Sequence, residues 1–387
     1  MSRFLYLALV SFFITTASWA DKVITGDQRT EMYFPLLKGK KIAVYSNATG
    51  MAGDKHIVDL LVENNMNVKA ILAPEHGFRL KADAGEHVSN EIDEATGIPV
   101  ISLYGRKDKR PLKELIDDYD VIITDIQDVG LRYYTYYVTM LKLMNACAES
   151  QKKMIVLDRP NPNGFYVDGP ILDMKHKSGV GGLPIPIVHG MTLGELALMI
   201  NGEHWLNEFR ICDLTVIPCS NYTHQTRYHL PIAPSPNLPN MKSIYLYSSI
   251  CFFEGTCASL GRGTEAPFQM FGHPDMKGYS FSFTPQSVPG AKNPPLLGQK
   301  CYGVDLRQIP NKKIWKQGIN LEYIIEAYHA VKMGDSFFTR FFEKLIGVDY
   351  VRKMIEEGKS AKEIKACWKE DVRKFKKQRK PYLLYSE

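Results

Sequence analysis

The feature that most limits the fold of this chain is a regular alternation of apolar runs and helical stretches between Lys40 and Asp158. Patterns typical of helices lie at residues 56–64, 111–117 and 136–150. Runs rich in Val, Ile and Leu predict buried strands at residues 41–46, 68–72, 100–104, 121–124 and 154–157. Strands without polar alternation are buried on both faces, and intervening helices allow parallel pairing. The pattern predicts an α/β fold with a parallel, doubly wound sheet.

The composition and pattern of the sequence change after the loop-forming run Asn161-Pro-Asn-Gly164. Pro and Gly become frequent, aromatic irregular segments dominate residues 183–310, and amphipathic helical patterns return at 321–331, 336–345 and 361–377. A chain of 387 residues also exceeds what one hydrophobic core usually organises. We expect a sheet domain at residues 21–164 and a mixed α+β domain at residues 165–387.

The first 20 residues have the layout of a signal peptide. Arg3 precedes an apolar run from Phe4 to Thr15, and small residues stand at the cleavage positions that end at Ala20. The run is short for a membrane span, and no Cys follows it to carry a lipid. We expect a periplasmic or secreted protein without a membrane anchor.

Composition excludes several classes of function. The net charge of +6 fits an acidic substrate without requiring one, and nothing beyond this charge supports nucleic-acid binding. The seven cysteines form no CxxC pair, although export would permit one or two disulfides. No GxGxxG, GxxxxGK[ST] or GxSxG motif occurs, so we expect no nucleotide cofactor and no serine nucleophile elbow. The sequence does not specify an oligomeric state.

Polar residues follow each predicted strand, at the edge where open α/β sheets bind ligands. A pocket built from these exits would contain carboxylates, and glycoside hydrolysis needs one carboxyl group as acid and a second group as base or nucleophile. The exits hold the following candidates: Asn47, Glu75, His76, Asp125, Arg132, Asp158 and Arg159.

Glu75 is the candidate general acid, because Phe78 offers an apolar neighbour that raises the pKa of a carboxyl group. It is equally able to pair with Arg79 or Arg132. Asp125 and Asp128 are the candidates for the second carboxylate. The alternative for both is capping of the loop that follows the strand, and it is favoured for Asp128.

A metal site is a competing interpretation of the same residues. Glu75, His76, Asp125 and His189 include the ligand types that zinc prefers. Their spacing matches no HExxH-type motif, so we expect no metal.

Several long motifs, in order along the chain, closely resemble the exo-β-N-acetylmuramidase family of the NamZ type. The resemblance spans residues 30–385. The motifs that carry it are Leu72-Ala-Pro-Glu-His-Gly-Phe78, Asp125-Ile-Gln-Asp-Val-Gly130, Arg132-Tyr-Tyr-Thr-Tyr136, Leu157-Asp-Arg-Pro-Asn-Pro162, Gly169-Pro-Ile-Leu172, His189-Gly-Met-Thr-Leu-Gly-Glu195, Pro234-Ser-Pro-Asn237, Phe253-Glu-Gly-Thr256, Gly261-Arg-Gly-Thr264 and Pro381-Tyr-Leu-Leu-Tyr385.

The resemblance implies a Rossmann-like N-terminal domain, a smaller second domain and an active site in the cleft between them. It implies release of N-acetylmuramic acid from the non-reducing end of peptidoglycan fragments, such as a muropeptide or disaccharide. It places the catalytic glutamate at Glu75, with His76 beside it, and implies no particular second group. The chain departs from the family pattern at Glu265, where relatives commonly have a neutral residue.

Muramic acid carries a lactyl carboxylate, which an arginine fork would recognise. Arg262, Arg132 and Arg159 are candidates for this contact, although the last two are equally suited to neutralising neighbouring aspartates. Tyr134 offers a ring for the pyranose. His189 and Glu254 lie in the motifs of the resemblance and complete the expected substrate-binding set.

Two other functions compete with the glycosidase. A metal-dependent carbohydrate hydrolase or deacetylase would use the histidines and carboxylates named above. A non-catalytic periplasmic sugar-binding protein would also have two α/β domains around a cleft, but would not need the glutamate motif.

Overall fold

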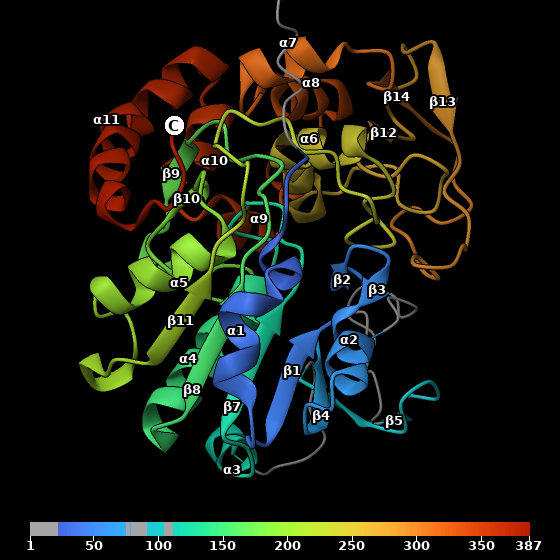
Figure 1. Ribbon diagram of the computed structural model, residues 1–387. Coiled ribbons are helices and arrows are strands. Elements are labelled where there is room, and N and C mark those ends of the chain that lie inside the picture. The colour runs from blue at the N-terminus through green and yellow to red at the C-terminus, as the bar shows by residue number, and fades with distance from the viewer. Residues whose placement is uncertain (1–21, 75–77, 79–90, 104–110) are drawn as a thin grey trace, which may run out of the picture.

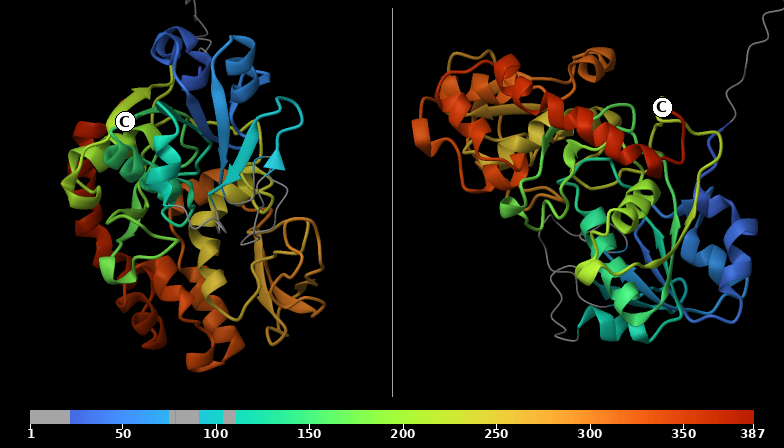
Figure 2. Two further views of the ribbon diagram at one scale, coloured as in Figure 1. Left: turned by 90° about the horizontal axis from the view of Figure 1, so that it is seen from below. Right: turned by 90° about the vertical axis from the view of Figure 1, so that its left-hand side faces the viewer.

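The computed structural model describes residues 22–74, 78, 91–103 and 111–387. Its lower half in Figure 1 is a large twisted sheet flanked by helices, and its upper half is mostly helical. Figure 2 shows that the long C-terminal helix crosses from the helical half towards the sheet half. None of the helices in the described ranges has the length and apolarity that a membrane span requires.

Seven strands form the large sheet, in the order β11-β8-β7-β1-β4-β6-β5. All neighbouring strands pair in parallel except β5, which is antiparallel to β6. The five predicted strands are all present, and the Rossmann-like α/β class is confirmed. The strand bounds are β1 Ile42–Ser46, β4 Val68–Ala73, β5 Glu91–Ile92, β6 Pro99–Ser102, β7 Val121–Asp125, β8 Lys153–Leu157 and β11 Asp213–Ile217.

Alternate residues of each strand face two different layers of helices, which makes the sheet doubly wound. Ile42 and Val44 of β1 pack in one apolar cluster with α1 (Thr30–Leu37) and α2 (Ile57–Glu63). Ala43 and Tyr45 of the same strand pack in the other cluster, which contains three helices: α3 Leu112–Asp117, α4 Tyr136–Ser150 and α5 Leu193–Gly202.

The second half is built from helices around a small antiparallel sheet with strand order β12-β14-β13. Its strands are β12 Met270–His273, β13 Phe281–Phe283 and β14 Cys301–Asp305. Its helices are α6 Met241–Ile250, α7 Asn311–Gln317, α8 Glu322–Val331, α9 Phe341–Ile346, α10 Tyr350–Glu356 and α11 Ala361–Arg379. The remaining strands of the described residues form two antiparallel pairs. These are β2 Met51–Ala52 with β3 Lys55–His56, and β9 Asp168–Ile171 with β10 Pro186–Val188.

The large sheet continues past residue 164, where we expected the boundary between the domains. Strand β11 is its edge strand, and α5 is the crossover helix that a parallel strand requires. A capping box begins α5, because the Thr192 hydroxyl accepts from the Glu195 N–H and the Glu195 carboxylate accepts from the Thr192 N–H. The large sheet therefore includes a helix and a strand from beyond the expected boundary.

All seven cysteines lie in the described residues, and none of them forms a disulfide.

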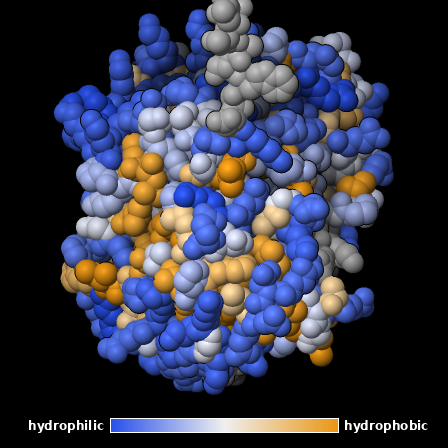
Figure 3. Space-filling view, viewed as in Figure 1, coloured by the Kyte–Doolittle hydropathy of each residue, from blue (hydrophilic) through white to orange (hydrophobic). Residues whose placement is uncertain are grey.

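Figure 3 shows a largely hydrophilic face with an apolar area on its left-hand side, over the region of α5 and β11. Phe209 and Ile211, in the connection between these two elements, are 79% and 62% exposed. Most of the cysteines and most of the other large apolar residues are buried.

The C-terminal tail is fastened to the edge of the large sheet by two buried carboxylates. The Tyr385 hydroxyl donates to Asp158 Oδ2 at 2.6 Å, and the N–H of Leu384 donates to Glu195 Oε1 at 2.8 Å. Burial raises the pKa of Asp158 to about 6, although hydrogen bonds from Thr192 and Tyr385 oppose this. These carboxylates therefore join the middle of the chain to its C-terminal tail.

Arg132 joins three segments of the chain in the interior. Its side chain is fully buried and donates to the carbonyl oxygens of Pro170 and Ile185 at 2.8 and 2.9 Å, and of Leu345 and Ile346 at 3.0 and 2.8 Å. Burial lowers the pKa of Arg132 to about 10, so it stays charged at neutral pH. This position gives Arg132 a structural role rather than contact with a ligand.

Removal of the Tyr385 hydroxyl should weaken the attachment of the tail. We expect Tyr385→Phe to lower the free energy of unfolding by about 1–3 kcal/mol, because Asp158 loses a hydrogen bond in a buried site. Urea unfolding measures this. The control is Tyr382→Phe, whose hydroxyl binds Glu203 at the half-buried surface. Equal losses in both variants would contradict the structural role of Tyr385.

Loss of the Arg132 guanidinium should destabilise the whole protein. We expect Arg132→Met to lower the free energy of unfolding by about 3–5 kcal/mol, because buried carbonyl groups lose their donors. Thermal and urea unfolding measure this loss. Arg373→Met, which removes an exposed pair with Glu370, should change stability by less than about 1 kcal/mol. An unchanged melting temperature for Arg132→Met would refute this role.

Candidate active site

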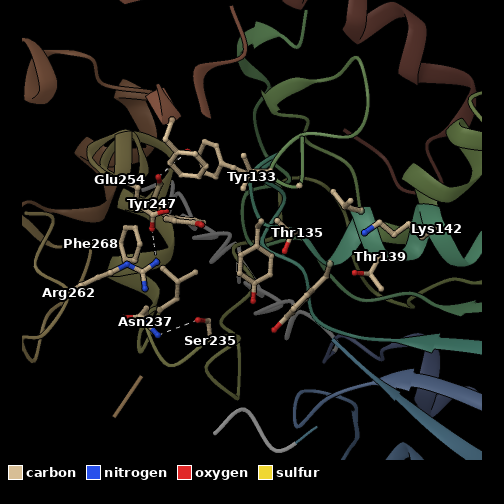
Figure 4. Close-up of a pocket in the computed structure, with 17 residues that line it drawn as sticks. Tyr133, Thr135, Thr139, Lys142, Ser235, Asn237, Tyr247, Glu254, Arg262 and Phe268 are labelled. Atoms are coloured by element: carbon tan, nitrogen blue, oxygen red, sulfur yellow. Dashed lines mark hydrogen bonds and ion pairs between the residues drawn. The ribbon is translucent and has the colours of Figure 1, made fainter. Parts of the chain in front are cut away.

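A pocket of about 400 Å³ opens between the segment that follows β7 and the second half of the chain. Its right-hand wall in Figure 4 carries Thr135, Thr139 and Lys142, and its left-hand wall carries Glu254 and Arg262. The remaining lining residues are Tyr133, Tyr134, Tyr136, Val138, Gly179, Val180, Ser235, Asn237, Leu238, Tyr247, Phe268 and Phe341. The pocket therefore combines residues of both halves.

Three tyrosines after β7 form an aromatic wall. The hydroxyls of Tyr134 and Tyr136 both donate to the Pro234 carbonyl, at 2.7 and 3.1 Å, and their rings meet edge to face at 4.8 Å. The Tyr133 hydroxyl donates to the Tyr247 carbonyl at 3.0 Å. Burial raises the pKa of Tyr133 and Tyr134 well above the usual range, so both stay neutral. These fixed rings give the pocket an apolar surface.

Glu254 and Arg262, both predicted substrate-binding residues, meet in the pocket. Arg262 Nη2 lies 2.6 Å from Glu254 Oε1, and the guanidinium also lies over the ring of Phe268 at 5.1 Å. Gly261 and Gly263 flank the arginine with φ of +84° and +79°, a backbone shape that favours glycine. The turn therefore presents the arginine, and the glutamate and ring hold it in one orientation.

Asn47 reaches the site from behind rather than lining it. Its Nδ2 donates to the Tyr136 hydroxyl at 3.0 Å, and its Oδ1 accepts from the Thr49 N–H and hydroxyl. Asn47, at the exit of β1, thus supports the aromatic wall through its hydrogen bond to Tyr136.

Asp125 and Arg159 form a buried cluster below the edge of the sheet. Arg159 Nε and Nη2 donate to Asp125 at 2.6 and 3.1 Å, and Nη2 also pairs with Asp27. Burial raises the pKa of Asp125, and it raises that of Asp27 to about 7, while Arg159 opposes both shifts. Neither Asp125 nor Arg159 lines the pocket. Arg159 neutralises aspartates, as its alternative role required, whereas Asp125 pairs with Arg159 rather than capping the loop after the strand.

Asp158 and His189 also lie in the interior. Asp158 accepts from Thr192, Gly194 and Tyr385, as a residue that holds the tail would. His189 is 1% exposed and its Nδ1 accepts from the Met191 N–H at 3.2 Å. Burial lowers the pKa of His189 to about 3, so the ring is neutral. The structure does not bring either side chain into the pocket.

Glu75 and His76 lie outside the described residues, which stop at Pro74 before them. Their catalytic roles therefore remain predictions from the sequence. In the part of the chain that is described, no group of three or more His, Cys, Asp or Glu side chains is arranged to hold a metal ion. Asp125 and His189, two members of the alternative zinc set, have the separate partners given above.

Lys142, Thr139 and Asn237 line the pocket but were not among the predicted site residues. Lys142 and Thr139 are three residues apart on α4, so they share one face of the helix. That spacing was visible in the sequence. The prediction, however, considered only the residues that follow each strand, so it covered the loop before α4 and not the helix itself.

Asp128, next to Asp125 in the exit of β7, has one carboxylate oxygen without a partner. Its Oδ1 accepts from the Gly130 N–H at 2.7 Å, whereas Oδ2 is buried and makes no hydrogen bond. The residue borders a small cavity of about 10 Å³. Burial raises the pKa of Asp128 to about 7.

This shift predicts a pH dependence of stability. Between about pH 4 and pH 7 the unfolded chain gives up the Asp128 proton while the folded chain keeps it, so the free energy of unfolding falls as pH rises. We expect Asp128→Asn to remove up to about 4 kcal/mol of that fall. Urea unfolding at several pH values measures it, and exposed Asp54→Asn is the control. Parallel curves for wild type and Asp128→Asn would disprove the shift.

Comparison with known proteins identifies both halves of the chain. The family model for the N-terminal domain of exo-beta-N-acetylmuramidase NamZ matches residues 42–242, and the model for the C-terminal domain matches residues 245–385. The first of these ranges includes β11, as the large sheet does. The peptidoglycan beta-N-acetylmuramidase NamZ of Bacillus subtilis (strain 168) is 39% identical over 385 residues, covering 94% of this chain and 92% of that protein.

Two solved structures share the fold. A DUF1343 family protein from Bacteroides fragilis NCTC 9343 is 64% identical, with a TM-score of 0.88 over 95% of this chain and 99% of its own. A second DUF1343 protein of that organism is 28% identical, with a TM-score of 0.79 over 94% and 99% of the two chains. The chain therefore belongs to the exo-beta-N-acetylmuramidase NamZ family of glycoside hydrolases.

Proposed function

We propose that this enzyme releases N-acetylmuramic acid from the non-reducing end of peptidoglycan fragments, and that the sugar binds in the pocket between the two halves. The observation that carries the proposal is the meeting of a tyrosine wall and the Glu254–Arg262 pair in one cavity of a chain from this family. A volume of about 400 Å³ is in the range of pockets for small ligands.

The tyrosine wall supplies the apolar contact that a pyranose ring needs. The hydroxyls of Tyr134 and Tyr136 are already bonded to Pro234, so the rings are held in place before a ligand arrives. Rings that are fixed in advance lose little conformational entropy on binding. We assign Tyr134 to contact with the face of the sugar.

Glu254 and Arg262 supply directed polar contacts on the opposite wall. Their ion pair uses one oxygen of the carboxylate and one nitrogen of the guanidinium. In the described chain the remaining N–H groups of Arg262 make no other hydrogen bond, so they are available to sugar hydroxyl or carbonyl groups. We assign both residues to orientation of the substrate.

The catalytic acid in this proposal is Glu75, supported by the motif Pro74-Glu-His-Gly77, with His76 as its neighbour. Asp125 was one sequence candidate for the second group. Because Arg159 binds both of its oxygens in the interior, we assign Asp125 to support of the sheet edge instead. The signal-peptide pattern of residues 1–20 further supports export, and we propose a periplasmic or secreted enzyme.

A chromogenic β-N-acetylmuramide tests the proposal directly, with the matching β-N-acetylglucosaminide as comparison. We expect release of the chromophore from the muramide only. Glu75→Gln should lower kcat at least about 100-fold, because the neutral amide cannot donate a proton to the leaving group.

The matched control is Glu91→Gln, an exposed glutamate of β5, which should keep the activity of the wild type. Hydrolysis of the glucosaminide alone would contradict the substrate assignment. Equal rates for wild type and Glu75→Gln would show that Glu75 is not the catalytic acid. That result would leave the assignment of the substrate intact.

A further inference from the structure

The charged side chains of the pocket do not cancel. Three of the described lining residues are charged, namely Lys142, Glu254 and Arg262. The 2.6 Å contact between Glu254 and Arg262 neutralises that pair. The charge of Lys142 remains, so the described part of the pocket is net positive and suits an anionic group on the ligand.

Lys142 is free to bind such a group. It is exposed, and no carboxylate of the described chain pairs with it, whereas Lys113 and Lys153 each bind an aspartate at 2.7 Å. Figure 4 shows its ammonium end directed from α4 into the pocket. Thr139, one turn earlier on α4, lines the same wall and adds a hydroxyl.

The start of α4 reinforces this positive charge. The helix begins at Tyr136, its first turn contains no acidic residue, and the Thr135 side chain does not cap it. Both Thr135 and Tyr136 line the pocket. The N-terminal end of a helix carries a partial positive charge, so it adds to the positive character of the pocket that Lys142 also lines.

The other basic residues considered for anion binding are occupied. Arg132 donates to four backbone carbonyls and Arg159 to two aspartates, both in the interior. Arg262 reaches the pocket but is held by Glu254. Among the described residues, Lys142 is therefore the pocket cation whose charge has no carboxylate partner.

We propose that Lys142 binds the lactyl carboxylate of N-acetylmuramic acid and makes the pocket select sugars in which this carboxylate is free. The inference rests on the proposed function. N-acetylglucosamine lacks the lactyl group, and a muramic residue that carries a stem peptide has an uncharged amide at this position. The ammonium of Lys142 discriminates against both, because neither offers it a negative charge.

Equilibrium binding separates this contact from catalysis. Calorimetry is carried out with the wild-type protein and three probes: N-acetylmuramic acid, its lactyl amide and N-acetylglucosamine. We expect the acid to bind about tenfold more tightly than the amide, as a charge-assisted hydrogen bond allows. Lys142→Met should remove that preference and leave binding of the amide unchanged, while Lys142→Arg should keep most of it.

Lys313→Met is the matched control, since Lys313 is an exposed lysine of α7 that does not line the pocket. It should retain the wild-type preference. The wild-type preference should also shrink as salt is raised from about 0.05 to 0.5 M, because ions screen an exposed contact. Melting temperatures of the variants confirm that each is folded.

The outcomes for this proposal and for the proposed function are distinct. Equal binding of acid and amide by the wild type would overturn the role of Lys142, as would an unchanged preference in Lys142→Met. Either result is compatible with hydrolysis of the muramide. Conversely, a Lys142-dependent preference in a protein that cleaves no muramide would support the binding site and reject the enzymatic assignment.

Discussion

The five-donor guanidinium of Arg132 is the constraint on which the pocket depends. It bonds to carbonyls of β9, of the segment before β10 and of the end of α9, and the tyrosine wall begins at the next residue. Gly347 makes room for it, because a Cβ there would lie 2.4 Å from the Arg132 nitrogen and its φ is +82°. One buried charge therefore fixes the position of the wall relative to the second half of the chain.

Two kinds of charge lie near the edge of the large sheet. Asp27 and Asp125 both bond to Arg159 in the interior, where burial makes any unpaired charge costly. Glu254, Arg262 and Lys142 belong to segments outside the strands of the large sheet, and their side chains keep some contact with solvent. The first group shapes the edge, and the second offers interactions to a ligand.

Sequence reasoning predicted the parallel core well because continuous Val and Ile runs identify strands that are buried on both faces. It missed α6, which is buried along nearly its whole length and so lacks an amphipathic pattern. For the site, Tyr134, Glu254 and Arg262, which were predicted to bind the substrate, line the pocket. Arg132, Asp158 and His189 have polar side chains that point inward, and the sequence alone does not distinguish a buried partner from a ligand contact.

The attachment of the tail has a consequence for how the protein reaches its folded state. Asp158 and Tyr385 are 227 residues apart, yet their side chains share one hydrogen bond in the interior. During synthesis the first half emerges long before its distant partner, so the edge at β8 and β11 remains incomplete in the nascent chain. The tail can therefore dock on this edge only after the whole chain has been synthesised.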